Sequence, residues 1–343
     1  MRSNTKKRPV TVVTGFLGSG KTTLLNKVLS EPSMKNTAVL VNEFGKVGLD
    51  HHLLRKIDEQ TILLGGGCLC CTVRDDLVKA LKDLLDMDQR GVISRVERII
   101  IETSGLADPA PIIFTILTDP VLQHHYYVDL VLVTVDAVNG NLHLSRQPES
   151  IKQISAADKI IVTKTDIATP EVITDLIARL QSLNPSVQIL EALSSEVALE
   201  ELFRSQEMEH TQTKNKVVSF DTTRMNDGAH VPDTRSISLT FDKPLDWTAF
   251  GLWLSMLLHA RGQDVLRVKG LIDVGEEGPV VLNGVQHIIH PPQHLASWPS
   301  DDCRSHLVFI MRSIDASDIL TSLSAFQSVL GASPILLETN VHV

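Results

Sequence analysis

The first half of the chain alternates short runs of β-branched apolar residues with longer stretches in which apolar residues recur at helical spacing. Such strands show little polar alternation, which is typical of strands buried on both faces. The pattern therefore predicts an α/β fold, with a mostly parallel sheet and helices on both of its faces. The expected strands are Val10–Thr14, Ala38–Val41, Thr61–Leu64, Arg98–Ile101, Leu130–Val135, Lys159–Val162 and Val187–Leu190. The expected helices are Lys21–Leu29, Asp75–Leu85, Ile151–Ala157 and Val172–Leu180.

The last third of the chain follows a different pattern, in which helices bracket a run of strands. A helix is expected over Asp246–His259, because Asp246 is a residue type that caps helix N-termini, and a second over Asp315–Val329. Together these elements predict a smaller C-terminal α+β domain with an antiparallel sheet. The expected strands are Ser236–Phe241, Val265–Val274, Val280–Leu282, Gln286–His290 and Leu307–Met311.

A polar, turn-rich segment separates the two patterns. We therefore predict a basic tail at residues 1–7, a first domain at 8–204, a linker at 205–234 and a second domain at 235–335. Two domains suit a chain of 343 residues, since one domain holds roughly 100–200.

The charge and composition exclude two classes of protein. The chain has 32 Lys and Arg against 41 Asp and Glu, and only 9 Phe, 3 Trp and 2 Tyr, which argues against nucleic acid as a partner. Its longest apolar stretch, Val128–Val138, contains two aspartates, and no uncharged run approaches the roughly 18 residues of a membrane span. The basic start lacks the apolar region and cleavage site of a signal peptide, so we expect a cytoplasmic protein with no membrane partner.

The segment after the first predicted strand reads GFLGSGKT and matches the phosphate-binding pattern G-x-x-x-x-G-K-[ST] at every fixed position. Its glycines allow backbone N–H groups to converge on phosphate oxygens at a helix N-terminus. Lys21 is expected to reach the β- and γ-phosphates, and the Thr22 hydroxyl to bind Mg²⁺. The predicted nucleotide-binding residues of this loop are Gly15, Gly18, Ser19, Gly20, Lys21, Thr22 and Thr23.

Two later strand ends complete a nucleotide site. Glu102 follows an isoleucine-rich strand and is expected to hold the Mg²⁺ shell, while the backbone N–H of Gly105 can approach a γ-phosphate. The segment TKTD resembles the guanine-specific pattern Asn-Lys-x-Asp, so Lys164 and Asp166 are predicted to bind the base. The Asp166 carboxylate can accept two hydrogen bonds that adenine cannot donate, which favours GTP over ATP. Thr163 stands where Asn is usual, so one supporting contact is expected to be weakened or rerouted.

Three of the four cysteines gather in the stretch GGGCLCC. The glycines allow the thiolates of Cys68, Cys70 and Cys71 to converge on one ion, as Zn²⁺ requires. The second ligand pair of a structural zinc finger does not follow, which favours an ion that is held and then released. The alternative is a set of buried, inert cysteines at a strand end.

At this point the chain resembles a known family, the CobW-like metallochaperone GTPases, which are relatives of UreG and HypB. The segments that carry the resemblance occur in the family's order: GFLGSGKTT, VNEFGKVGLD, GGGCLCCTVR, IIIETSGLADP and TKTD. The likeness extends to the C-terminal part, where LRVKGLIDV and HLVFIMR resemble that family's smaller domain. It implies a P-loop GTPase domain and assigns Cys68, Cys70 and Cys71 to the metal motif.

The resemblance also assigns Asn42 to Asp50 to a segment that responds to the nucleotide. Lys46 stands where many relatives have Glu, and a protonated lysine cannot help to bind a cation. Glu43 is therefore left as the carboxylate ligand of the transition metal. Glu43 and Asp50 are also the candidates for orienting the attacking water, beside Lys21 and Glu102 as predicted catalytic residues.

The leading hypothesis is a GTPase with slow intrinsic turnover that couples its nucleotide state to holding and delivering Zn²⁺ or Co²⁺. The expected partners are GTP with Mg²⁺, the transition metal, a client metalloprotein and a second copy of the chain. One alternative is a P-loop kinase of a small molecule, which would leave TKTD and the cysteines unexplained. Another is a non-catalytic zinc store or thiol switch.

Overall fold

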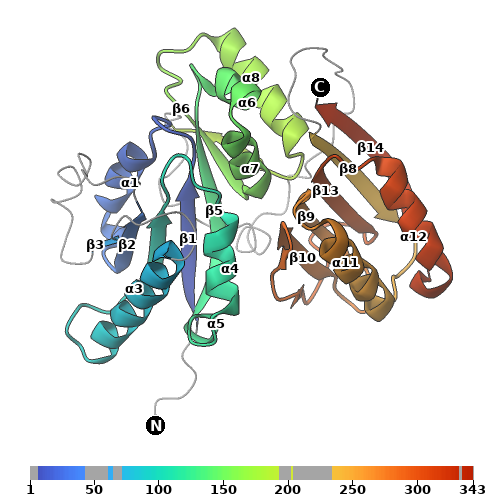
Figure 1. Cartoon of the computed structure of the whole chain (residues 1–343), viewed down its shortest axis with the longest axis horizontal. Helices are drawn as coiled ribbons and strands as arrows, with labels where there is room; N and C mark the ends of the chain where they lie inside the picture. The colour runs from blue at the N-terminus through green and yellow to red at the C-terminus, as the bar shows by residue number, and fades with distance from the viewer. Residues whose placement is uncertain are drawn as a thin grey trace. The chain divides into compact units, whose positions relative to one another are not determined.

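The computed structural model describes residues 7–42, 61–64, 72–192, 202–203, 234–331 and 334–342. The chain divides into two compact units, one built on a parallel sheet and the other on an antiparallel sheet (Figure 1). The predicted tail and linker lie outside the described residues, apart from Lys7 and from Thr234, which begins a strand. The domain limits at 8–204 and 235–335 stay predictions.

The first sheet is parallel throughout its described strands, which confirms the predicted fold class. Each strand predicted from the sequence of the first half is present, with ends that differ by a few residues. Across the sheet the order is β3 (Thr61–Leu64), β2 (Thr37–Asn42), β4 (Arg98–Glu102), β1 (Arg8–Thr14), β5 (Tyr126–Asp136), β6 (Lys159–Thr163) and β7 (Gln188–Glu191).

Helices cover both faces of this sheet, because alternate residues of its apolar strands point to opposite sides. In β4, Ile99 and Ile101 pack in one cluster with side chains of α3 (Thr72–Gln89) and α4 (Ala110–Thr118), which run in front of the sheet in Figure 1. Ile100 packs with α1 (Lys21–Leu29) on the other face. The remaining helices are α5 (Leu122–His125), α6 (Gly140–Arg146), α7 (Pro148–Ala156), α8 (Pro170–Leu183) and the short 3₁₀ turn Pro32–Met34.

The second sheet is antiparallel, as predicted. Its order is β11 (Ile288–Ile289), β10 (Val280–Val285), β9 (Val265–Ile272), β13 (Ser305–Arg312), β8 (Thr234–Phe241) and β14 (Pro334–His342), with β12 (Gln293–His294) also paired to β10. Two helices accompany it, α11 (Trp247–Arg261) and α12 (Ala316–Leu330). Asp246 caps α11 as predicted, since its carboxylate accepts a hydrogen bond from the Ala249 N–H.

One predicted strand of this half, Gln286–His290, is present only as the two residues Ile288–Ile289. The segment Gln286–His290 is a tight turn followed by a two-residue strand, because Gln286 adopts a left-handed backbone with φ of 53°. The chain therefore folds back, and Ile288 pairs with Val285 of β10. The sequence pattern also failed to indicate β14, which pairs with β8.

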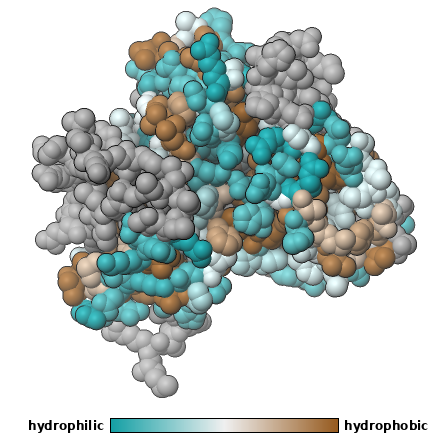
Figure 2. Space-filling view, in the orientation of Figure 1, coloured by the Kyte–Doolittle hydropathy of each residue, from teal (hydrophilic) through white to brown (hydrophobic). Residues whose placement is uncertain are grey.

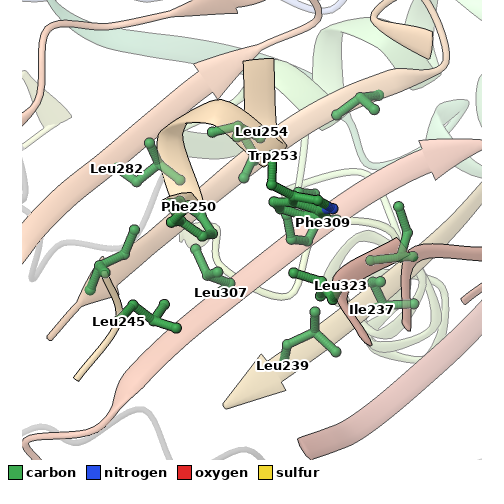
Figure 3. Packing of buried hydrophobic residues seen from close by; sticks show 14 of the residues in the cluster. Ile237, Leu239, Leu245, Phe250, Trp253, Leu254, Leu282, Leu307, Phe309 and Leu323 are labelled. Carbon is green, nitrogen blue, oxygen red and sulfur yellow. The ribbon is translucent and has the colours of Figure 1, made fainter. Parts of the chain in front are cut away.

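In the core of the second unit, aromatic rings pack among aliphatic side chains (Figure 3). The ring of Trp253 meets that of Phe309 edge to face, with centroids 6.0 Å apart, and Phe250 packs beside Trp253. The indole N–H of Trp253 donates a hydrogen bond to Ser322 of α12, so the buried polar atom is satisfied. Among all the residues that the structure describes, none of the helices combines the length and apolar character needed to cross a membrane.

Candidate functional site

The strand order places the predicted nucleotide-binding segments at one edge of the first sheet. β1 lies between β4 and β5, and Val13 of β1 is aligned with Glu102 of β4. Because parallel strands end at the same edge, the phosphate loop after β1 and the segment after β4 emerge together. Ligands of open α/β sheets bind at this carboxyl edge.

The phosphate loop owes its shape to its glycines. Gly15, Gly18 and Gly20 all have positive φ, at 139°, 70° and 90°, which other residues rarely adopt. A Cβ on Gly15 would also lie 2.4 Å from the Thr134 carbonyl oxygen. Gly20 is the N-cap of α1 and offers no side chain to the first N–H groups of that helix. Those N–H groups and the helix dipole form an anion site at the end of the loop.

Two residues at the start of α1 connect the loop to the rest of the site. Lys21 is 8 % exposed, and its ammonium donates hydrogen bonds to the carbonyl oxygens of Gly15 and Phe16, at 2.8 and 3.2 Å. The Thr22 hydroxyl donates to Oε1 of Glu102 at 2.7 Å, and Glu102 is 4 % exposed. A hydroxyl and a carboxylate held together are hard oxygen ligands, so these two residues fit the Mg²⁺ site predicted for them.

Gly105 lies directly against the phosphate loop. A Cβ built on Gly105 would come within 2.5 Å of the Leu17 backbone nitrogen, so only glycine permits this approach. The Gly105 carbonyl oxygen accepts a hydrogen bond from Gln153 of α7. The structure therefore brings Gly105 to the loop, as its predicted role at a γ-phosphate requires.

The TKTD segment reaches the same loop through Thr163. Its hydroxyl lies 2.7 Å from the Ser19 carbonyl oxygen, to which it donates, and 3.2 Å from that of Val135. Ser19 in turn exchanges a hydrogen bond with Thr134, with their hydroxyl oxygens 2.7 Å apart. Threonine in place of asparagine thus still ties the end of β6 to the phosphate loop.

Lys164 is held by an acid that sequence reasoning missed. Asp136, at the end of β5, is aligned with Thr163 of β6, and its Oδ2 lies 2.6 Å from the Lys164 ammonium. Asp136 is 2 % exposed and also accepts hydrogen bonds from the Val138 N–H and the Asn139 side chain. Burial raises the pKa of Asp136, but the hydrogen bonds from Lys164, Asn139 and Val138 outweigh it and leave that pKa below its ordinary value.

The ion pair also accounts for the backbone of Lys164, which is left-handed with φ of 58°. A non-glycine residue keeps that conformation where its surroundings stabilise it. Asp166, two residues on, is exposed at the same edge. An acid directly after a strand was the signal that revealed Glu102, and the same signal could have revealed Asp136.

His143 of α6 is a second residue that the sequence did not indicate. Its ring packs on Phe16 of the phosphate loop, with centroids 4.5 Å apart. Burial lowers the pKa of His143, and the Lys164 charge lowers it further, against an opposite effect of Asp136. The lowered pKa favours the neutral form of the imidazole beside the loop.

Several predicted site residues lie outside the described residues: Glu43, Asp50, Cys68, Cys70 and Cys71. The predicted transition-metal site therefore stays a prediction. Within the ranges that the structure describes, no group of three or more His, Cys, Asp or Glu side chains could hold a metal ion. The fourth cysteine, Cys303, is exposed.

Comparison with known proteins identifies the family. Residues 9–191 match the profile described as CobW/HypB/UreG, nucleotide-binding domain, and residues 234–327 match the Cobalamin synthesis protein cobW C-terminal domain. The chain belongs to the CobW/HypB/UreG family. Its first unit therefore carries the nucleotide-binding domain of a CobW/HypB/UreG protein, and the resemblance noted from the motifs is confirmed.

Relatives within the family are similar over most of their length. The zinc chaperone YjiA of Escherichia coli is 33 % identical, across 88 % of this chain and 93 % of the relative. The zinc-regulated GTPase metalloprotein activator 1 of Schizosaccharomyces pombe is 29 % identical, across 82 % and 75 %. The crystal structure of Zn(II)-bound YjiA GTPase from E. coli superposes with a TM-score of 0.69 at 28 % identity, covering 94 % of this chain and 99 % of the other.

Proposed function

We propose that this chain is a zinc metallochaperone that hydrolyses GTP and uses its nucleotide state to hold and deliver the metal to a client protein. The observation that carries the enzymatic part is the 2.7 Å hydrogen bond between Thr22 and Glu102, next to the Lys21 ammonium. It joins the phosphate loop to the neighbouring strand in the arrangement that phosphoryl transfer needs. The zinc part is supported by the names of two relatives, the zinc chaperone YjiA and the zinc-regulated activator.

The residues of the loop act mainly by electrostatics. On nucleotide binding, the Lys21 ammonium exchanges its hydrogen bonds to the loop carbonyls for hydrogen bonds to the phosphates, and the N–H groups at the start of α1 bind the same anion. Thr22 and Glu102 would hold Mg²⁺, which supplies positive charge against the charge that develops on the phosphates during hydrolysis. Because the chain's donors are preorganised by glycine geometry and by burial, they need little rearrangement when a water attacks.

Recognition of the base falls to the TKTD segment. Asp166 accepts the hydrogen bonds of guanine, and Lys164, held by Asp136, lies along the base. Adenine lacks the matching donors and would leave the Asp166 carboxylate unpaired, which costs affinity.

The metal is cargo rather than a fixed part of the protein. Cys68, Cys70 and Cys71 are the proposed ligands, with Glu43 as the carboxylate from the segment that responds to the nucleotide. Three thiolates favour Zn²⁺, and Co²⁺ is the competitor to be tested. When the γ-phosphate is lost, movement of the segment 42–50 would remove Glu43 from the ion, and by linkage zinc must alter GTP affinity by the same factor.

The edge that carries the nucleotide site also suits a protein partner. Large apolar side chains are exposed in the segments that follow β1, β4, β5 and β6, on a unit whose other apolar residues are mainly in its core. They are Leu17, Leu106, Val138, Leu142 and Ile167. Either the client metalloprotein or a second copy of the chain would bury them while contacting the nucleotide.

The test is competitive Zn²⁺ and Co²⁺ affinity with Mg²⁺ and either a non-hydrolysable GTP analogue or GDP. The analogue is expected to change zinc affinity at least about tenfold relative to GDP, which is a coupling of roughly 1.4 kcal/mol. The double substitution Cys70→Ser/Cys71→Ser should abolish that difference, whereas Cys303→Ser, at the exposed cysteine, should not. Equal zinc affinity in both nucleotide states would contradict the proposal and leave a zinc store.

A further inference from the structure

Helix α7 holds the segment that follows Glu102 through two consecutive side chains. The Gln153 amide nitrogen donates hydrogen bonds to the carbonyl oxygens of Gly105 and Ala107, at 3.1 and 3.0 Å. The Lys152 ammonium lies 3.3 Å from Oδ2 of Asp108. One helix therefore fixes both the backbone and a side chain of the segment 105–108.

The chemistry of Gln153 suits two carbonyl acceptors. A side-chain amide nitrogen carries two protons, and each points to one of the carbonyl oxygens of Gly105 and Ala107. The opposite orientation of the amide would set its oxygen against two carbonyl oxygens, so the hydrogen bonds decide the orientation.

The two hydrogen bonds come with one unpaired atom. Gln153 is 1 % exposed, and its Oε1 has no hydrogen-bond partner among the described residues. An apolar side chain of the same size would avoid that unpaired oxygen but would remove the donors from the carbonyl oxygens of Gly105 and Ala107. The contribution of Gln153 therefore lies in the two hydrogen bonds that it donates to the segment 105–107.

The end of β4 and the segment 105–108 also contact the phosphate loop. Glu102 accepts the hydrogen bond from Thr22, and Gly105 packs on the Leu17 backbone so closely that a Cβ would meet its nitrogen at 2.5 Å. Both of those contacts belong to the nucleotide site. Gln153 approaches the same backbone from α7, through the peptide that follows Gly105.

We propose that Gln153 is the positioning residue that presets Gly105 to meet a γ-phosphate, and that it thereby sets the preference of this chain for GTP over GDP. The inference rests on the proposed GTP function. GDP lacks the γ-phosphate, so only GTP benefits from a Gly105 N–H that is already in place. Without Gln153 the segment must be ordered when GTP binds, and that entropic cost weakens GTP binding alone.

The experiment measures the affinities of a non-hydrolysable GTP analogue and of GDP, with Mg²⁺, for wild type and Gln153→Met. Methionine keeps the length and loses both donors. Analogue affinity is expected to fall about tenfold while GDP affinity changes less than about twofold. Ser155→Ala is the matched control, because Ser155 lies on the same helix, is fully buried and makes no hydrogen bond with its hydroxyl among the described residues. It should change neither affinity.

A second variant separates the hydrogen bonds from the shape of the side chain. In Gln153→Glu an ionised carboxylate faces two carbonyl oxygens, whereas its protonated form can again donate to one of them. Analogue affinity of Gln153→Glu should therefore improve, relative to wild type, as the pH is lowered from 8 to 6. Gln153→Met should show no such change.

Equal losses of analogue and GDP affinity in Gln153→Met would refute the proposal and reduce Gln153 to a stabilising residue. Unchanged affinity for both ligands would refute it as well. If the wild-type chain bound neither the GTP analogue nor GDP, the proposed GTP function itself would be wrong. That outcome is detected with the wild-type protein alone.

Discussion

The Thr163 hydroxyl donates a hydrogen bond to the carbonyl oxygen of Ser19, 2.7 Å away, and so joins the end of β6 to the phosphate loop. The two residues are 144 positions apart in the chain. A Cβ on Gly20 would lie 3.5 Å from the Thr163 methyl group, which is ordinary contact, so glycine is favoured there by its φ of 90° and not by the space that Thr163 needs. Although Thr163 replaces the asparagine of the guanine-specific pattern, its hydroxyl therefore still connects the base site to the phosphate loop.

Replacing Thr163 with valine should weaken both GTP and GDP binding to the same extent. The substitution keeps the shape but removes the proton donated to Ser19, and a buried carbonyl left without its donor costs about 1–3 kcal/mol. Titration with fluorescent nucleotide analogues measures the loss of affinity, and urea unfolding measures the free-energy cost of the unpaired carbonyl. Thr163→Ser keeps the hydroxyl and is the control; a serine variant as impaired as the valine variant would show that the methyl group matters instead.

Thr22→Ala should make nucleotide binding insensitive to Mg²⁺. The Thr22 hydroxyl and Glu102 are the proposed oxygen ligands, and Thr22→Ser retains the hydroxyl. The affinity of Thr22→Ala for GTP, measured with Mg²⁺ and with EDTA, is expected to be the same, whereas wild type and Thr22→Ser should bind more tightly with Mg²⁺. Phosphate release should slow at least about 100-fold in the alanine variant. A full Mg²⁺ response in Thr22→Ala would contradict the assignment.

Asp136→Asn should lower discrimination between GTP and ATP. The neutral amide no longer pairs with the Lys164 ammonium, so the left-handed backbone that leads to Asp166 loses its support. The ratio of GTP to ATP affinity is expected to fall about tenfold, which corresponds to the loss of one charged hydrogen bond. Asn139→Ala removes another partner of Asp136 without touching Lys164, and it should leave the ratio unchanged.

Asp136 should also make stability depend on pH in the acid range. Its folded-state pKa is lowered, despite burial, by the hydrogen bonds from Lys164, Asn139 and Val138. A lowered pKa stabilises the fold above the unfolded value of about 3.9, and the contribution is lost as the pH falls through the folded value. Urea unfolding from pH 7 to pH 3 should show the advantage of wild type over Asp136→Asn shrinking below about pH 4. A constant difference over that range would contradict the lowered pKa.

Phe309→Ala should destabilise the second unit by about 3–5 kcal/mol, because it removes the edge-to-face partner of Trp253 from a closed core (Figure 3). Tryptophan fluorescence during urea unfolding follows the loss directly. The control is Met256→Ala, since Met256 of α11 is 55 % exposed. Figure 2 shows that hydrophobic residues also lie scattered among hydrophilic ones on the surface. Met256→Ala should change the free energy of unfolding by no more than about 0.5 kcal/mol. Equal effects of both substitutions would mean that the core is not packed as described.

Local patterns were sufficient for most of the strands. Runs such as Val10–Thr14 report burial on both faces, and burial on both faces implies a parallel sheet between helices. The helix Lys21–Leu29 was predicted with its observed ends, and the other predicted helices of the first half differ from the observed ones by one to four residues at their ends. Helix α4, whose sequence APIIFTILT lacks polar alternation, was not predicted. The turn at Gln286 was missed because a left-handed glutamine leaves no trace in hydrophobic periodicity.

By itself the sequence determined the phosphate loop, the strand-end acid Glu102 and the family, because each rests on residues adjacent in the chain, whose glycines and strand ends constrain the backbone locally. Only the tertiary structure decided that Asp136 holds Lys164, 28 residues away, and that Gln153 holds Gly105, 48 residues away. Those contacts follow from strand order and register, with Asp136 aligned to Thr163 and β1 between β4 and β5. The hydrophobic pattern of one segment fixes which face of the sheet each residue points to, but packing over the whole sheet decides which strands and helices lie side by side.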